Sequence, residues 1–321
     1  MSGPKATIET GMLLTNGPMS SILYFERMAA YQTFDIEGHT MAALALNPGT
    51  AGEPVILVHG ITGNIAIWQV NLLPMLLEQG PCYSLSLPGH FPAAFPPGFR
   101  REQLTAEILA RVMAGAVRQM VGERSVTLMG HSTGGFAALN VAAHYPGMAR
   151  RIVSMSGFAH GRWTGFLGLS QRLVRTGEVG KTVFKTIYRL AGATPVLFRA
   201  ALRKRIVDLK TPYVNPKLDE VIGLILFNFQ NLDLDAMAQY FAVMPDIDIT
   251  PLLSHIQVPT LMIASERDPS VPPEESRKIA AMLPGAELAI LPGVGHLSFL
   301  ERPVQYQSVL STWLQKTQFG V

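Results

Sequence analysis

The chain has a single cysteine, few charged residues and no long apolar run among its 321 residues. One cysteine, Cys82, excludes an internal disulfide and a zinc-finger scaffold. No apolar stretch approaches the ~20 residues of a membrane span, and the first residues lack the basic-then-apolar order of a signal peptide. We therefore expect a cytoplasmic protein. Charged residues make up 15% of the chain and hydrophobic residues 48%, so most of it should fold around a large core.

Patterns that bind cofactors, metals or nucleic acids are also missing. No G-x-G-x-x-G follows an expected strand, and no group of His, Cys and Asp residues has metal-ligand spacing. We therefore predict neither a nucleotide cofactor nor a metal. The formal net charge is +3, and no basic patch accompanies a reading element, so binding to nucleic acid is not expected.

Apolar runs alternate with helical patterns along most of the chain. Two runs with alternating or continuous apolar residues, at 32–36 and 40–46, predict a hairpin. Continuous apolar runs, typical of strands covered on both faces by helices, lie at 54–60, 82–87, 126–129, 151–156, 260–264 and 287–291. Helical patterns lie at 66–79, 102–121, 133–144, 274–283 and 303–314. This order predicts an α/β protein with a mostly parallel, doubly wound sheet. Residues 1–30 have no clear period and form a predicted N-terminal extension.

The alternation stops between about residues 158 and 248, where helical patterns continue without a buried strand. Residues 160–217 hold twelve Lys and Arg residues against two acidic residues, whereas the rest of the chain holds 14 basic and 21 acidic residues. A shift in charge this sharp, inside an insertion, predicts a separate structural unit.

The pentapeptide at 130–134, Gly-His-Ser-Thr-Gly, places Ser132 between an expected strand and an expected helix. A G-x-S-x-G in that context is typical of a serine on a sharp, strained turn, whose hydroxyl projects above the sheet. The flanking glycines are needed because a Cβ at either position would collide with the neighbouring strand or helix. The pentapeptide alone is a weak signal, because glycine and serine are common.

Four further segments, in the right order, make the chain resemble the α/β-hydrolase superfamily. They are a His-Gly turn at 59–63, Leu-Pro-Gly-His at 87–90, an acid-bearing strand segment at 258–272, and Gly-Val-Gly-His at 293–296. The resemblance covers roughly residues 32–314. It implies the α/β-hydrolase fold with a helical cap inserted after the sixth strand. The core would then comprise residues 31–159 and 249–321, and the cap, or lid, residues 160–248.

The resemblance implies a Ser–Asp–His triad. A serine hydroxyl needs a base within hydrogen-bond distance, and the base needs a third group that fixes its tautomer. We expect Ser132 to be the nucleophile, His296 the general base and then acid, and Asp268 the group that orients the imidazole. Glu266 stays an alternative. We favour Asp268 because of its position relative to the Val-Pro at 271–272.

Two backbone N–H groups, those of Ile61 and Thr133, are expected to form the oxyanion hole of such an enzyme. His59 and His131 lie inside motifs, but histidines at such positions more often form structural hydrogen bonds than take part in the reaction. We expect Trp68, Phe158 and Trp163 to line the substrate pocket, although each could instead be part of the core. These aromatic residues favour a lipophilic substrate.

Within the superfamily that the chain resembles, dehalogenases and epoxide hydrolases carry aspartate at this turn, and Ser132 argues against both. The sequence therefore predicts hydrolysis of a carboxylic ester of a small molecule or lipid, through an acyl-enzyme intermediate and without a cofactor. Alternatives are a hydrolase of carbon–carbon bonds or lactones that uses the same triad, and a slow, hydrolase-like ligand-binding protein.

Basic residues on one stripe of the predicted cap suggest a second role. Lys181, Lys185 and Arg189 fall four residues apart and so share one side of a helix, and Arg203, Lys204, Arg205 and Lys210 follow. The cap could make weak contact with an anionic membrane surface or an acidic lipid. The alternative is an ordinary lid whose lysines lie in water.

Overall fold

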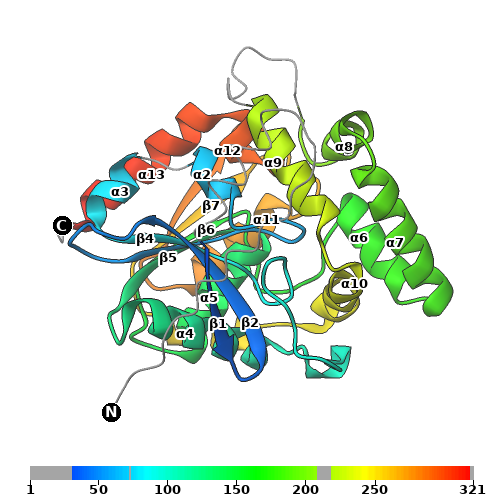
Figure 1. Ribbon diagram of the computed structural model, residues 1–321. Coiled ribbons are helices and arrows are strands. Elements are labelled where there is room, and N and C mark those ends of the chain that lie inside the picture. The colour runs from blue at the N-terminus through cyan, green and yellow to red at the C-terminus, as the bar shows by residue number, and fades with distance from the viewer. Residues whose placement is uncertain (1–30, 72–73, 208–217, 319–321) are drawn as a thin grey trace.

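An eight-stranded sheet forms the centre of the computed structural model, which describes residues 31–71, 74–207 and 218–318 (Figure 1). The predicted extension at 1–30 lies outside the described residues, as does Lys210. The strands are β1 (Tyr31–Ile36), β2 (His39–Asn47), β3 (Val55–Val58), β4 (Cys82–Leu85), β5 (Val126–His131), β6 (Ala149–Met155), β7 (Thr260–Ser265) and β8 (Glu287–Leu291).

The strands are arranged in the order β1-β2-β4-β3-β5-β6-β7-β8. β1 and β2 form the expected hairpin, and β2 also pairs antiparallel with β4. The remaining pairs, from β4 through to β8, are all parallel. Every residue of β3 and β7 is buried, which accounts for their apolar sequences, because helices cover both faces of a parallel sheet. The predicted doubly wound, mostly parallel sheet is thus confirmed.

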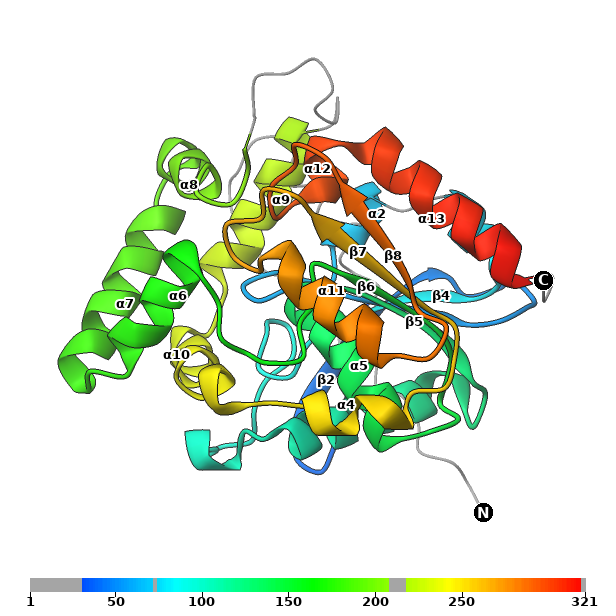
Figure 2. The same ribbon diagram turned by 180° about the vertical axis from the view of Figure 1, so that it is seen from behind.

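Helices pack on both faces of the sheet (Figures 1 and 2). Helices α4 and α5 lie on one face, and α12 and α13 lie on the other. The helices that flank the sheet are α2 (Ile67–Asn71), α3 (Pro74–Gln79), α4 (Ala106–Val121), α5 (Thr133–His144), α11 (Pro273–Met282), α12 (Ser298–Glu301) and α13 (Pro303–Gln318).

Two of the expected helices are divided. The helix expected at 66–79 is α2 followed by α3, which begins at Pro74, where the missing N–H of a proline is tolerated. The helix expected at 102–121 is α4, preceded by a separate short turn of 3-10 helix, η1 (Arg101–Gln103). Thr105 separates the two because its hydroxyl accepts a hydrogen bond from the Ile108 N–H at 3.2 Å and so caps α4.

Between β6 and β7 the described residues form five α-helices, which are called the inserted helices below, and two short 3-10 helices, η2 (Met244–Asp246) and η3 (Thr250–His255). The inserted helices are α6 (Gly165–Val174), α7 (Glu178–Gly192), α8 (Pro195–Leu202), α9 (Leu218–Gln230) and α10 (Leu234–Val243). In both views α6, α7, α8 and α10 gather beyond one end of the sheet (Figures 1 and 2). An antiparallel bridge joins His160 to Asp248, near the two ends of the insertion. That residues 160–248 act as a cap stays a prediction.

Candidate active site

Ser132 lies on the turn between β5 and α5. Its backbone has φ 55° and ψ −117°, a strained conformation for a residue with a Cβ. Its N–H donates to the Met155 carbonyl at 2.7 Å, and its own carbonyl accepts from the Phe136 N–H at 3.0 Å. A Cβ at Gly130 would overlap the Gly134 carbonyl, so this turn requires glycine there. The close packing of β5 and α5 thus holds the serine in its strained position.

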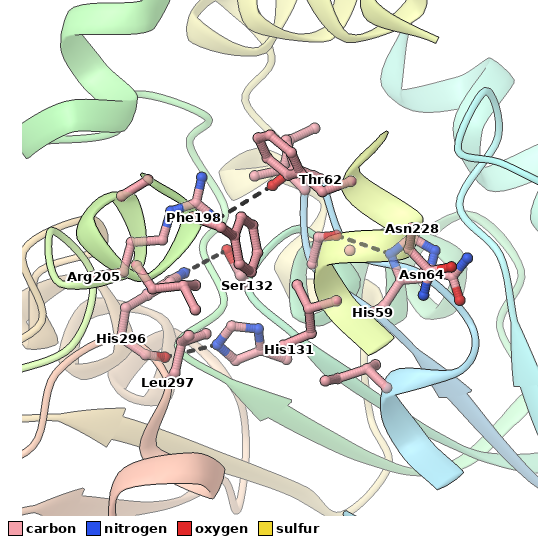
Figure 3. A pocket seen from close by; sticks show the side chains of 18 of the residues that line it. His59, Thr62, Asn64, His131, Ser132, Phe198, Arg205, Asn228, His296 and Leu297 are labelled. Atoms are coloured by element: carbon pink, nitrogen blue, oxygen red, sulfur yellow. Dashed lines mark hydrogen bonds between the residues drawn. The ribbon is translucent and has the colours of Figure 1, made fainter. Parts of the chain in front are cut away.

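Three side chains from distant parts of the sequence form one chain of hydrogen bonds. Ser132 Oγ lies 3.0 Å from His296 Nε2 (Figure 3). On the other side of the ring, His296 Nδ1 lies 2.7 Å from Asp268 Oδ2. Ser132 and His296 are each 1% exposed and Asp268 7%, so little water competes for these bonds. Glu266, the alternative acid, is exposed, and its carboxylate accepts from the Gly293 N–H at 2.7 Å. The structure therefore brings Asp268, and not Glu266, to the histidine.

The surroundings of Asp268 favour its charged form. Its Oδ1 accepts hydrogen bonds from the N–H groups of Ser270 at 2.8 Å and Val271 at 2.9 Å. Burial by itself raises the pKa of Asp268, but the charge and hydrogen bond of His296 and these two N–H groups outweigh it, so the pKa lies below its usual value. A charged Asp268 keeps the proton of His296 on Nδ1, which leaves Nε2 able to accept a proton from Ser132.

His59 and His131 hold the backbone around the site. His59 Nε2 accepts from the Leu87 N–H at 3.2 Å, so its Nδ1 donates to the Gly60 carbonyl at 2.9 Å. His131 Nε2 donates to the His296 carbonyl at 2.8 Å. Burial lowers the pKa of His59 to about 4, and burial together with the charge of His296 lowers that of His131 to about 3. Both rings are therefore neutral at pH 7, which suits these structural bonds.

The two N–H groups predicted for the oxyanion hole belong to residues near the serine. Ile61 lines the cavity together with Ser132, and Thr133 is the first residue of α5. Within the described part of the chain, neither N–H donates a hydrogen bond to another group. Unpaired donors next to a serine are what the negative oxygen of a tetrahedral intermediate requires.

A mostly apolar cavity lies over Ser132, with an empty space of about 970 Å³ that includes its open mouth. Both the sheet side and the inserted helices contribute to it, since residues after β3 and β5 face residues of α6 to α9. Trp68, predicted to line the pocket, lies in its wall and is 1% exposed. Other apolar residues in the wall are Ile67, Phe166, Phe198, Phe229 and Phe299.

The structure places the other two predicted pocket residues in the core. Phe158 stacks on Phe136 of α5, with ring centroids 5.2 Å apart, and meets the Trp163 ring edge-on at 5.7 Å. Trp163 in turn packs against Phe241 of α10 at 5.2 Å. Neither residue lines the cavity over Ser132. Both rings pack against apolar residues of α5 and α10 instead of lining the cavity.

Sequence reasoning did not assign Thr62, Arg205 or Tyr188 to the site, yet all three line the cavity. Arg205 belongs to a run of three basic residues that, in the sequence, is indistinguishable from an exposed charged segment. Thr62 has φ 58°, which is rare for a β-branched residue, but only its position directly after the His-Gly turn could have signalled a role.

The basic stripe of α7 is partly neutralised. Lys181 pairs with Glu178 at 2.6 Å, and Lys185 pairs with Asp235. Successive residues of an α-helix are rotated by about 100° around its axis, so the other side of α7 carries a different set of side chains. These are exposed and apolar: Val179, Val183, Ile187 and Leu190. No helix in the described segments has the length and apolarity to cross a bilayer. Membrane-surface contact and a cytoplasmic location stay predictions.

A family model described as "Alpha/beta hydrolase family" matches residues 55–306, most of the chain. The chain belongs to the alpha/beta hydrolase family. It is therefore a hydrolase, and the resemblance drawn from its motifs is confirmed. Within the described residues, no cluster of three or more His, Cys, Asp or Glu side chains is arranged to hold a metal ion.

Relatives of this alpha/beta hydrolase have several names. The chain is 26% identical over 266 residues to the pyrrolizixenacetamide deacetylase of Xenorhabdus hominickii, covering 82% of this chain and 91% of the relative. It is 25% identical over 268 residues to a pimeloyl-[acyl-carrier protein] methyl ester esterase of Neisseria meningitidis, covering 83% and 78%. The crystal structure of the enol-lactonase from Burkholderia xenovorans has a TM-score of 0.69 at 18% identity, covering 88% of this chain and 99% of that one, which shows the shared fold.

Proposed function

We propose that this alpha/beta hydrolase cleaves a carboxylic ester through an acyl-enzyme intermediate. The observation that carries the proposal is the hydrogen-bonded chain from Ser132 through His296 to Asp268, at the base of a mostly apolar cavity. The names of two relatives, an esterase and a deacetylase, support acyl transfer to water as the class of reaction.

Acylation begins when His296 Nε2 takes the hydroxyl proton of Ser132, and Oγ attacks the carbonyl carbon of the ester. The carbonyl oxygen becomes an oxyanion, for which the N–H groups of Ile61 and Thr133 are the donors at hand. Losing one such donor typically costs about 3–4 kcal/mol of transition-state stabilisation. The tetrahedral intermediate then collapses, and the alcohol leaves with the proton that His296 gives back.

Deacylation repeats these steps with water. His296 removes a proton from a water molecule, the resulting oxygen attacks the acyl-enzyme, and Ser132 Oγ recovers its proton as the acid leaves. Asp268 keeps the ring in the required tautomer throughout and stabilises its positive charge. The His131 bond to the His296 carbonyl fixes the loop that carries the base.

The walls of the cavity favour a substrate with a lipophilic body. Aromatic and aliphatic side chains, Trp68 and Phe299 among them, supply most of the surface above the serine. Transfer of apolar area from water into such a pocket is worth roughly 25 cal/mol per Å² before the costs of ordering are subtracted. A small-molecule or lipid ester with an apolar acyl group matches this lining.

The proposal is tested by hydrolysis of p-nitrophenyl acetate, butyrate, octanoate and palmitate. Ser132→Ala should lower kcat/KM by at least about 10⁴-fold, because the nucleophile and its base act as a unit. Ser254→Ala, which alters an exposed serine, is the matched control. Turnover that survives in Ser132→Ala would refute the assignment.

The same assay separates the alternatives. A lactone hydrolase or carbon–carbon hydrolase with this triad would leave the four esters untouched yet turn over a lactone or a β-diketone, and would lose that activity in Ser132→Ala. A ligand-binding protein would turn over none of these compounds at a rate above that of Ser132→Ala.

A further inference from the structure

A guanidinium group lies inside the cavity that contains Ser132. Arg205 follows α8 and lines the cavity, with its side chain partly buried. Its Nη1 donates to Thr62 Oγ1 at 3.2 Å, a bond drawn above the Ser132–His296 bond in Figure 3. An arginine offers five N–H donors, and within the described residues this is its one hydrogen bond of good geometry. Most of its donors therefore have no partner of good geometry among the described residues.

In the part of the chain that the structure describes, no carboxylate balances this charge. Among the described residues, no Asp or Glu side chain forms an ion pair with Arg205 or lines the cavity. The nearby Glu301 carboxylate accepts instead from the Val207 N–H at 3.0 Å and the Gly295 N–H at 2.9 Å. Burial lowers the pKa of Arg205, but arginine starts from a value so high that it stays charged near pH 7. A cation in an apolar cavity is costly unless an anion accompanies it.

A second polar group lies against the arginine. The Tyr188 hydroxyl is buried next to the Arg205 guanidinium and the Ser170 side chain, and it makes no hydrogen bond of good geometry with a described residue. Burial raises the pKa of Tyr188, and the nearby Arg205 charge and the Ser170 side chain oppose that rise. The hydroxyl thus lies next to the guanidinium, and together the two groups have more donors than they use in hydrogen bonds of good geometry with the described residues.

The backbone ties this corner of the cavity to the reacting groups. Arg205 accepts a hydrogen bond on its carbonyl from the His296 N–H at 2.8 Å. Its side-chain partner, Thr62, directly follows Ile61, one of the two oxyanion donors proposed above. Thr62 has a left-handed backbone, a strain of the kind that persists where the surroundings fix it. The guanidinium is thereby tied to the His-Gly turn in the cavity that Ser132 also lines.

We propose that Arg205, with Tyr188 beside it, binds a carboxylate group of the substrate, so that the enzyme prefers an ester with an apolar body and a carboxylate near the scissile bond. This inference rests on the proposed ester hydrolysis. A carboxylate suits the site because a single guanidinium can bind it through two parallel hydrogen bonds.

The simplest alternative is that Arg205 only ties the inserted helices to the His-Gly turn. A structural tie would affect every substrate alike, whereas a carboxylate-binding residue discriminates between charged and neutral esters. The experiment therefore measures a ratio of two kcat/KM values. Two pairs of nearly isosteric esters cover the two sides of the scissile bond: mono-p-nitrophenyl glutarate against p-nitrophenyl 5-methylhexanoate, and 4-carboxyphenyl acetate against 4-isopropylphenyl acetate.

In Arg205→Gln, the charged-to-neutral ratio should fall about 10- to 100-fold relative to wild type for at least one pair, the range expected for a hydrogen bond to a charged group. Arg205→Lys should recover part of the ratio, because it keeps the charge and loses the planar fork. Arg203→Gln, an exposed arginine two residues earlier, is the matched control and should leave both ratios unchanged. Melting curves of each variant confirm that it folds.

An unchanged ratio for both pairs in Arg205→Gln, with the neutral esters still hydrolysed, would overturn the inference and leave the proposed function intact. If wild type hydrolyses none of the esters, the proposed function fails, and binding then decides the inference. In that measurement the dissociation constant of hexanoate is compared between Ser132→Ala and the double variant Ser132→Ala/Arg205→Gln. Binding at least 10-fold weaker in the double variant supports the site, and equal binding refutes it.

Discussion

Replacing Asp268 by asparagine tests how the site controls its proton. Asp268 Oδ1 accepts from the Ser270 and Val271 N–H groups, and Oδ2 lies 2.7 Å from His296 Nδ1. In Asp268→Asn the amide oxygen must stay with the two N–H donors, because an NH₂ group there would face them donor to donor. The amide NH₂ then points at His296 Nδ1, which must become the acceptor.

The consequence is a change of tautomer at His296. With Nδ1 accepting, the proton of the neutral ring moves to Nε2, the atom that must take the proton of Ser132. A base in the wrong tautomer typically loses about 10⁴-fold in kcat, which is equivalent to about 5.4 kcal/mol at 1.36 kcal/mol per decade. We therefore expect kcat/KM for p-nitrophenyl butyrate to fall by about 10³- to 10⁴-fold, with folding retained.

Glu266→Gln is the matched control, because it removes a carboxylate two residues away that is exposed and bonded to the Gly293 N–H. This variant should keep its activity within about threefold of wild type, as expected for an exposed residue away from the reacting groups. If Asp268→Asn and Glu266→Gln lost activity equally, or if Asp268→Asn stayed within 10-fold of wild type, the assignment of Asp268 would be refuted.

Two further predictions concern stability. The folded pKa values of His59 and His131, about 4 and about 3, lie below the ordinary histidine value of 6.5, so folding favours the neutral rings. Their contribution to the free energy of unfolding is complete above pH 6.5 and is lost as the pH falls, by about 3 kcal/mol for each ring between pH 6.5 and 4. Urea unfolding across this range measures the free energy of unfolding, and a value that does not change with pH would contradict the prediction. Phe158→Ala should cost about 3–5 kcal/mol of stability without changing the acyl-chain preference, whereas Trp68→Ala should change that preference; a shifted preference in Phe158→Ala would place Phe158 in the pocket after all.

Local sequence predicted the sheet and the residues of the candidate site where the chain itself dictates the geometry. The buried strand β3 reads as four apolar residues, and the elbow at Ser132 needs glycines whose absent Cβ atoms make room for a neighbouring strand and helix. Asp268 and His296 each follow a strand of a parallel sheet. The carboxyl ends of such strands meet at one edge, so the order of these motifs agreed with the triad that the family resemblance implies.

Residues whose place depends on packing between distant helices could not be predicted in this way. Phe158 and Trp163 look in sequence like pocket aromatics, but α5 and α10 offer them apolar partners away from the cavity. Arg205 looks like a surface base, since Arg203 and Lys204 before it are exposed. After α8 the chain turns toward Thr62, and this turn brings the Arg205 side chain into the cavity.

Covalent labelling shows in one experiment whether Ser132 is a nucleophile that His296 activates. Wild-type protein is treated with a fluorophosphonate probe, and intact mass and peptide mapping follow the adduct over time. We predict one adduct per chain, located on Ser132, absent in Ser132→Ala and formed much more slowly in Asp268→Asn. A wild-type protein that stays unlabelled, or an adduct that persists in Ser132→Ala, would show that Ser132 is not an activated nucleophile.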